Sequence, residues 1–299
     1  MTILYRPILL TCLAIAFTFC FNPSAIALSS NNLDTFNTGL EYLRQHDYLQ
    51  ALQEFTNIEE GDNLTGAAYS NRCLINLQLQ NNAEAEADCA IAIKYNPNNL
   101  EAYLNLGLAE YRQGKYQNAI ANYQKIIDRN QQDYRAYYNR GLGYFALKQY
   151  QNAIADYKTA LKYTPTANTE PQSIIHNDLA LAYMVLNKNE LAIDNFSQAI
   201  SLDSNNYGAY YNRGCAYHQQ GKYQIAIQDL SHAVLLKPDF TQAYVHRGII
   251  NHQIGATKNA FNDLTLALKQ YQDRNNQEQF NAVLNLKQQL FYNQPSKVV

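Results

Sequence analysis

The sequence has no tryptophan, and its 299 residues include only 12 glycines and 7 prolines. This scarcity of helix-breaking residues favours a helical protein. Charged residues make up 16% of the chain and nearly balance, with 25 acidic and 23 basic side chains, so no basic surface points to nucleic acid. The sequence motifs of nucleophilic, nucleotide-binding and zinc-dependent enzymes are also missing. We therefore expect no catalysis, no cofactor, no metal site and no nucleic-acid partner.

Long apolar runs are also rare, and the one at residues 8–21 is preceded by a single positive charge, Arg6. Ala25 and Ala27 follow it at the spacing of a signal-peptidase site. The run is shorter than the ~20 residues that cross a membrane. We interpret residues 1–27 as a signal peptide that exports the protein to a bacterial periplasm or the medium. The alternative is an uncleaved membrane anchor.

One six-residue stretch, AYYNRG, occurs twice, at 136–141 and 209–214. Related stretches recur along the chain, and each ends on a small residue. These residues are Gly39, Cys73, Gly107, Gly141, Ala180, Gly214 and Gly248, with spacings of 34, 34, 34, 39, 34 and 34. A fixed period of this length indicates a stacked repeat array. The five extra residues of the longer spacing lie within 164–171 and predict an inserted loop.

Each period predicts two helices. In the fourth period, small and large residues recur at helical spacing over 137–144 and again over 153–160, on either side of a break near Lys148. Because the connection is short, the two helices are expected to be antiparallel. Residues equally far from the break then lie level with each other.

A charge pattern follows this geometry. Arg140 lies eight residues before Lys148, and Asp156 lies eight residues after it. The same two positions hold an arginine and an aspartate in four periods: Arg72 with Asp88, Arg140 with Asp156, Arg213 with Asp229, and Arg247 with Asp263. Where the first position is leucine, the second is asparagine. The pattern predicts structural ion pairs within the hairpins, and the alternative is an arginine that binds a ligand carboxylate.

The repeated pattern A-Y-x-x-[RL]-G-x-x-Y, continued by alanine, an aromatic residue, alanine and proline at set distances, resembles the tetratricopeptide repeat (TPR). The resemblance covers about 32–272 and implies an all-α, right-handed α-solenoid of about seven TPR helix hairpins. We place repeats 1–4 at 32–165, the inserted loop at 166–171, repeats 5–7 at 172–275 and a C-terminal capping helix at 276–293. An amphipathic cap is expected because the last repeat of a solenoid leaves an apolar face uncovered.

The resemblance also implies an inner groove lined by the first helix of each repeat. The positions that it places there are Leu104, Leu108, Arg112, Tyr138, Leu142, Phe145, Leu181, Tyr211, Cys215, His218 and His252. This apolar and aromatic stripe suits a peptide with hydrophobic anchors, and the alternative is packing between neighbouring repeats.

One known class of TPR ligand is not expected. A clamp for heat-shock chaperone tails would need lysine and asparagine where Phe36 and Leu40 stand. Asparagine does recur two positions before the small residue, at Asn71, Asn105, Asn139 and Asn212, but without the lysines of the clamp. We therefore do not expect a chaperone tail as the partner.

Three cysteines remain after the predicted signal peptide. Cys73 and Cys89 depart from the repeat pattern within one repeat and lie nearly level across its turn at Gln80. Export would expose them to an oxidising compartment. They are either joined by a disulfide or two buried thiols, whereas Cys215 has no level partner and is expected to be free.

These features together predict an exported, non-catalytic scaffold that binds a peptide or partner protein in its concave groove. Two alternatives stay open. The protein could be a structural or self-assembling component of the cell envelope, or an accessory subunit of a membrane-associated enzyme complex.

Overall fold

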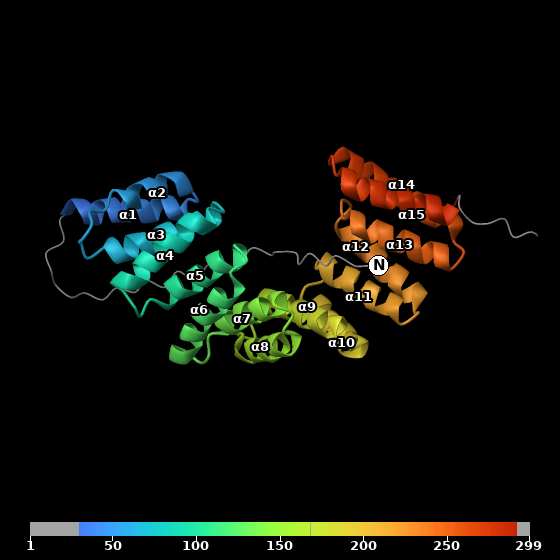
Figure 1. Ribbon diagram of the computed structural model, residues 1–299, viewed down its shortest axis with the longest axis horizontal. Helices are drawn as coiled ribbons and strands as arrows, with labels where there is room; N and C mark the ends of the chain where they lie inside the picture. The colour runs from blue at the N-terminus through green and yellow to red at the C-terminus, as the bar shows by residue number, and fades with distance from the viewer. Residues whose placement is uncertain (1–29, 168, 292–299) are drawn as a thin grey trace, which may run out of the picture.

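The computed structural model describes residues 30–167 and 169–291, which fold into fifteen helices and no strand (Figure 1). The predicted signal peptide, 1–27, lies outside the described residues. The helices are α1 (Ser30–Arg44), α2 (Tyr48–Thr56), α3 (Thr65–Gln78), α4 (Asn82–Tyr95), α5 (Leu100–Arg112), α6 (Tyr116–Arg129), α7 (Tyr134–Ala146), α8 (Tyr150–Tyr163), α9 (Thr169–Val185), α10 (Asn189–Leu202), α11 (Tyr207–Gln219), α12 (Tyr223–Leu236), α13 (Thr241–Gln253), α14 (Thr257–Asp273) and α15 (Gln277–Phe291).

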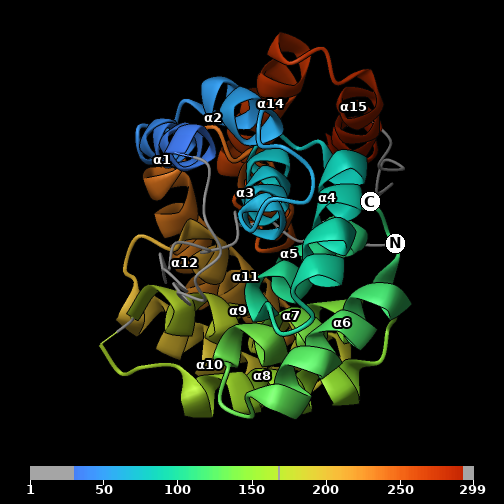
Figure 2. The ribbon, with the colours of Figure 1, turned by 90° about the vertical axis from the view of Figure 1, so that its left-hand side faces the viewer.

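The helices form seven successive hairpins, which stack along a curved path. Both ends of the array lie on the same side of the middle repeats in two perpendicular views (Figures 1 and 2). In the central repeats the odd-numbered helices lie on the inner side of the curve and the even-numbered helices on the outer side. Neighbouring odd helices also contact one another: α3 with α5, α5 with α7, α9 with α11 and α11 with α13. The chain is therefore an α-solenoid with an inner layer of odd helices.

The hairpin turns follow the same period as the small residues. Each turn holds one residue in the left-handed region, with φ between 56° and 79°: His46, Gln80, Gly114, Lys148, Asn187, Gly221 and Gly255. Only three of the seven are glycine, although other residues adopt this conformation at a cost of about 1–2 kcal/mol. The tight turn therefore comes from the packing of the two helices as much as from its own residue.

Within each hairpin, the small residue makes room for a large side chain sixteen positions later. A Cβ on Gly107 would lie 2.6 Å from the Tyr123 ring, and one on Gly141 would lie 2.7 Å from the Tyr157 ring. Both tyrosines are almost completely buried. Close approach of the two helices therefore depends on the missing side chain at these two positions.

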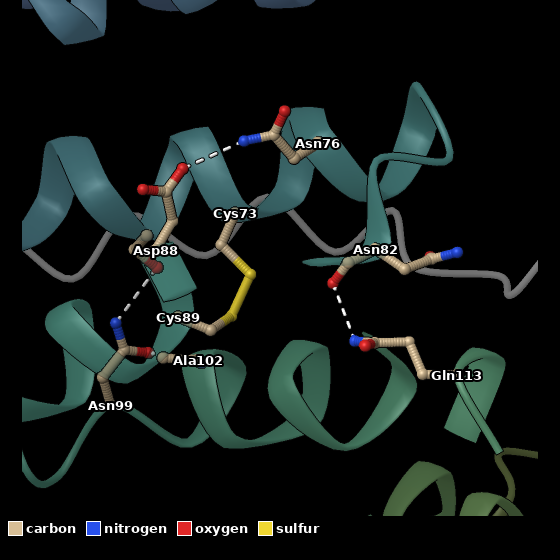
Figure 3. Close-up of a disulfide and its surroundings, with 9 residues drawn as sticks. Cys73, Asn76, Asn82, Asp88, Cys89, Asn99, Ala102 and Gln113 are labelled. Carbon is tan, nitrogen blue, oxygen red and sulfur yellow. Dashed lines mark hydrogen bonds between the residues drawn. A yellow bond between two sulfur atoms is a disulfide. The ribbon is translucent and has the colours of Figure 1, made fainter. Parts of the chain in front are cut away.

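In the second hairpin, a disulfide occupies this small–large position pair. Cys73 of α3 and Cys89 of α4 are bonded, with their Cα atoms 5.2 Å apart (Figure 3). Both residues are completely buried. The crosslink stands where the third and fourth hairpins each have a glycine-to-ring contact between their two helices. Cys215 is free and buried.

All four arginine–aspartate pairs expected from the spacing are present. The shortest nitrogen–oxygen distances are 3.0 Å for Arg72–Asp88, 2.7 Å for Arg140–Asp156, 2.8 Å for Arg213–Asp229 and 2.7 Å for Arg247–Asp263. The aspartates are buried and the arginines half-buried. Three of the arginines also donate to the preceding repeat: Arg140 to Gln124, Arg213 to Ser197 and Arg247 to Ser231. These side chains therefore join neighbouring repeats as well as the two helices of one hairpin.

The predicted inserted loop at 166–171 is partly wrong. Helix α9 begins at Thr169, so residues 169–171 form its first turn. Pro171 is compatible with this because the first turn of a helix needs no backbone donor there. A continuous apolar core containing Tyr157 of α8 and Leu179 of α9 crosses the junction. The insertion thus lengthens a helix within an unbroken solenoid.

The C-terminal helix covers the end of the array as expected of a cap. Val283 of α15 is buried against Leu264, Leu268 and Tyr271 of α14. Helix α15 begins at Gln277, close to the expected start at 276. Residues 292 and 293 of the predicted cap lie outside the described residues.

Candidate functional site: the concave surface

We use "concave surface" for the half-buried side chains that the odd helices present along the inner side of the curve. Three of the positions predicted to line it are in fact buried, with exposures of 5% for Leu104, 8% for Leu108 and 6% for Cys215. The first two lie on α5, where every residue from 102 to 110 is buried because α3, α4, α6 and α7 surround the helix. These three side chains therefore belong to the core.

Other predicted positions are half-buried and engaged in contacts between elements. The Arg112 guanidinium donates to the backbone carbonyl of Leu77, 2.7 Å away, and so ties α5 to α3. Phe145 packs edge-on against Tyr150 at the start of α8. His252 packs edge-on against Phe291, so the capping helix covers part of this position. These residues support the walls of the concave surface.

A line of polar contacts runs across three odd helices in the middle of the array. Tyr138 of α7 donates its hydroxyl hydrogen to Asp178 of α9 over 2.8 Å. The Asn177 amide donates to the same carboxylate over 3.1 Å. Asn212 of α11 in turn donates to the side-chain oxygen of Asn177 over 3.2 Å. Because these contacts join α7, α9 and α11 directly, the residues lie on the inner layer, where Tyr138, Asn177 and Asp178 are half-buried and Asn212 is buried beneath them. Leu142 and Leu181, both half-buried, come from the same helices.

Asp178 differs in its electrostatics from the aspartates that are paired with arginines. Asp178 is half-buried, and its carboxylate accepts hydrogen bonds from α7 and from its own helix. This burial raises the pKa of Asp178 from 3.8 to about 6, against the lowering effect of the hydrogen bonds from Tyr138 and Asn177. At neutral pH the carboxylate is therefore largely ionised, although its surroundings stabilise the negative charge less well than water does.

A second cluster lies two repeats beyond Asp178, around His246 of α13. Its ring stacks on Tyr211 with ring centroids 5.3 Å apart, and its Nδ1 lies 3.1 Å from the Cys215 sulfur. Burial, assisted by the charge of His218, lowers the pKa of His246 to about 4, so the ring is neutral at pH 7. His218 itself lies 2.8 Å from the Gln253 side-chain oxygen.

The chemistry of this cluster favours recognition over reaction. Burial raises the pKa of Cys215 to about 12, against a hydrogen bond from Tyr211, so the thiol stays protonated at neutral pH and is a poor nucleophile. Within the described ranges, no group of three histidine, cysteine or acidic side chains has the arrangement to hold a metal ion. Together with the contacts around Asp178, the concave surface thus offers tyrosine rings, leucines, amides and imidazoles beside one carboxylate. Such groups suit contacts with a peptide backbone and with apolar side chains.

Asp178 and His246 were not among the residues predicted from the sequence. Both occupy the position two before the small residue, which holds asparagine in the five other repeats: Asn37, Asn71, Asn105, Asn139 and Asn212. The recurring asparagine is visible in the sequence, and so are the two repeats that depart from it. Those exceptions were the signal that could have found the two residues.

Comparison with protein families identifies the repeats. Models described as "Tetratricopeptide repeat" match residues 74–133, 104–168 and 207–240, and one described as "TPR repeat" matches 180–221. Together the matches cover more than half of the chain and lie within the helical array, and the match at 207–240 spans the α11–α12 hairpin. The chain is a tetratricopeptide repeat protein. Proteins built from such repeats are generally non-catalytic scaffolds for protein–protein interaction.

Solved TPR structures share the fold at low sequence identity. A TPR protein from Parabacteroides merdae superimposes with a TM-score of 0.67 at 19% identity, over 87% of this chain and 99% of that one. YrrB, described as a TPR protein with an unusual peptide-binding site, gives a TM-score of 0.52 at 19% identity, over 67% of this chain and 97% of its own.

Curated relatives match only in part. The tetratricopeptide repeat protein 4 homolog of Dictyostelium discoideum is 31% identical over 29% of this chain and 24% of its own length. RNA polymerase II-associated protein 3 of Xenopus tropicalis is 28% identical over 56% of this chain and 27% of its own. The chain thus spans about a quarter of the length of these relatives.

Proposed function

We propose that this TPR protein binds an extended peptide or a segment of a partner protein on its concave surface, between repeats 4 and 7. The observation that carries the proposal is the line of contacts from Tyr138 through Asp178 and Asn177 to Asn212. It fixes polar groups and a tyrosine ring side by side across three repeats. The half-buried Leu142 and Leu181 lie on the same helices and supply apolar contact area. Side chains that are held in place before binding lose little entropy when a peptide docks.

We also propose that the protein acts outside the cytoplasm. Two features support this: the signal-like pattern of residues 1–27 and the Cys73–Cys89 disulfide, since disulfides persist mainly in oxidising compartments. The described part of the chain contributes no helix with the length and apolar character needed to cross a membrane.

The proposal is tested by crosslinking residues 28–299 in an extract of the source cells and identifying the captured proteins by mass spectrometry. A Tyr138→Ala/Tyr211→Ala variant removes two rings from the concave surface. A matched variant, Tyr95→Ala/Tyr223→Ala, removes two exposed tyrosines from α4 and α12 of the outer layer. We expect one set of partners to be captured by the wild type and the matched variant but lost from the concave-surface variant. The same partners in all three samples, or self-crosslinking alone, would contradict the proposal and favour the outer surface or self-assembly.

A further inference from the structure

Asp178 interrupts a regular series of asparagines. The position two before the small residue is asparagine in repeats 1, 2, 3, 4 and 6, aspartate in repeat 5 and histidine in repeat 7. Asparagine and aspartate have nearly the same shape, so the exchange in repeat 5 adds a negative charge without altering the packing volume. The charge stands near the centre of the array, between α7 and α11.

This carboxylate has no cationic partner. Among the described residues, no lysine, arginine or histidine nitrogen lies within 4.0 Å of Asp178, in contrast to Asp88, Asp156, Asp229 and Asp263, each of which is paired with an arginine. Its hydrogen bonds come from two neutral groups, Tyr138 and Asn177. A partly desolvated charge that is stabilised only by neutral donors gains strongly when a cation reaches it.

The basic side chains of the neighbouring odd helices are engaged elsewhere. On α7, Arg135 is bonded to Glu101 and Asp133 at 2.6 and 2.9 Å. Arg140 of α7 and Arg213 of α11 are held in the ion pairs of their own hairpins. On α9 itself, His176 lies 2.9 Å from the Asn195 side-chain oxygen, and on α13 His246 is neutral at pH 7. The charge of Asp178 is thus left for a ligand to balance, and the residue is only half-buried.

Apolar groups lie close to the carboxylate. Leu181 follows one helical turn later on the same face of α9, and the Tyr138 ring is held beside Asp178 by its hydroxyl. A long side chain that ends in a positive charge has the matching design, with an apolar stem and a cationic tip. Lysine and arginine are the two such residues in a peptide.

We propose that Asp178 is a specificity site that selects peptides carrying a lysine or arginine, whose charged end pairs with the carboxylate while its stem lies against Tyr138 and Leu181. This inference rests on the proposed function, because it names the chemistry of the ligand that the concave surface binds. The burial that raises the pKa of Asp178 agrees with it, since a bound cation would relieve the cost of the buried charge.

The test is a selection of random twelve-residue peptides, displayed on phage, against three forms of residues 28–299. These are the wild type, Asp178→Asn and Glu110→Gln. Glu110 is the matched control: it is a buried carboxylate on α5 that also lacks a cationic partner among the described residues and accepts a hydrogen bond from Asn122, but at 7% exposure it offers no surface to a ligand. Circular dichroism establishes that each form is folded.

We expect peptides selected by the wild type and by Glu110→Gln to be enriched in lysine and arginine relative to those selected by Asp178→Asn. For a peptide selected by the wild type, replacing its basic residue with norleucine should weaken binding about 10-fold or more, the usual scale of a charge-assisted hydrogen bond. The norleucine comparison needs only the wild type, so it stands even if Asp178→Asn fails to fold.

The two proposals fail in different ways. Peptides recovered with the same basic content from all three forms, or bound equally well after the norleucine replacement, would overturn the role of Asp178 and leave peptide binding intact. Recovery of no specific peptide by the wild type would contradict peptide binding itself.

Discussion

At the scale of single residues, the solenoid tolerates variation in its turns but not where a glycine packs directly against a tyrosine ring. Turn positions hold histidine, glutamine, lysine and asparagine as well as glycine. By contrast, a Cβ added to Gly107 or Gly141 would lie less than 3 Å from a tyrosine ring. The turn position therefore accepts many residues, whereas the small-residue position requires glycine where it faces a tyrosine ring and holds Cys73 or Ala180 elsewhere.

This contrast predicts opposite outcomes for two equivalent glycines. We expect Gly141→Ala to lower the free energy of unfolding by about 1–2 kcal/mol, because a Cβ 2.7 Å from the completely buried Tyr157 ring forces the packing apart. Gly248→Ala should be nearly neutral, since its closest neighbour is the Leu264 side chain at 3.1 Å, and alanine gains about 1 kcal/mol of helix propensity. Urea unfolding of both variants measures the difference, and equal destabilisation would contradict the steric account.

Asp178 predicts a pH dependence of stability with a defined sign. Its pKa is about 6 in the folded protein, against 3.8 for an aspartate in water, so between these values the folded state binds more protons than the unfolded state. Its contribution to stability is therefore present at low pH and is lost as the pH rises from about 4 to 7. The ionisable groups that face it, Tyr138 from α7 and Tyr157 from α8, are phenols, and burial raises the pKa of Tyr157 well above 10.

We accordingly expect Asp178→Asn to be more stable than the wild type at pH 7.5, by about 1–3 kcal/mol, and to lose that advantage at pH 4.5. Thermal unfolding at the two pH values is the measurement. Glu110→Gln serves as a comparison for the general loss of a buried acid. An Asp178→Asn variant that is destabilised equally at both pH values would show that its hydrogen bonds outweigh the cost of its charge.

At the scale of helices and hairpins, the two positions of the arginine–aspartate pair are occupied by different combinations in different repeats. Four hairpins use the ion pair, and two use leucine with asparagine, as at Leu106 and Asn122. Each of these two solutions leaves no charge alone, whereas the first hairpin places Thr38 opposite the half-buried Glu54. A mixture of the two, an aspartate opposite a leucine, does not occur in the sequence.

The missing mixture predicts a strongly non-additive pair of substitutions. Arg140→Leu alone leaves Asp156 buried without its cation and should cost about 3 kcal/mol. Adding Asp156→Asn recreates the pairing of Leu106 with Asn122 and should recover most of that loss. A double-mutant cycle by chemical unfolding gives the coupling energy, and a value near zero would mean that solvent already screens the pair.

At the scale of the whole molecule, the period and the positions of small and large residues were enough to predict the repeat fold, the ion pairs and the capping helix. Each of these depends on contacts within one repeat or between two adjacent repeats, so a local pattern encodes them. The concave surface was harder to predict. Leu104 and Leu108 occupy inner positions, yet α5 is enclosed by its neighbours and buries them. Exposure depends on how tightly successive repeats close around a helix, and the period does not specify this.

The cysteine pair shows the same limit to what the sequence predicts. The sequence placed Cys73 and Cys89 level with each other but left open whether they were bonded. The structure joins them because the small–large position pair brings the two helix backbones closest together, with the Cα atoms 5.2 Å apart. Two cysteines whose Cα atoms lay more than about 7 Å apart could not be bridged without moving the backbone.

A solenoid has two ends, and its association state depends on how they are covered. Here α15 buries Val283 against Leu264, Leu268 and Tyr271 of the last repeat. Val283→Asp would place a charge in this contact, detach α15 and expose the apolar face of α14. Two copies of the variant can cover these apolar faces by packing them against each other, so we expect the variant to self-associate. Light scattering after gel filtration measures this directly.

Asn285→Asp adds the same charge at an exposed position of the same helix and should stay in the state of the wild type. If Val283→Asp also stayed in that state, the cap would be dispensable for solubility, and the inner packing of α13 and α14 would suffice to end the array.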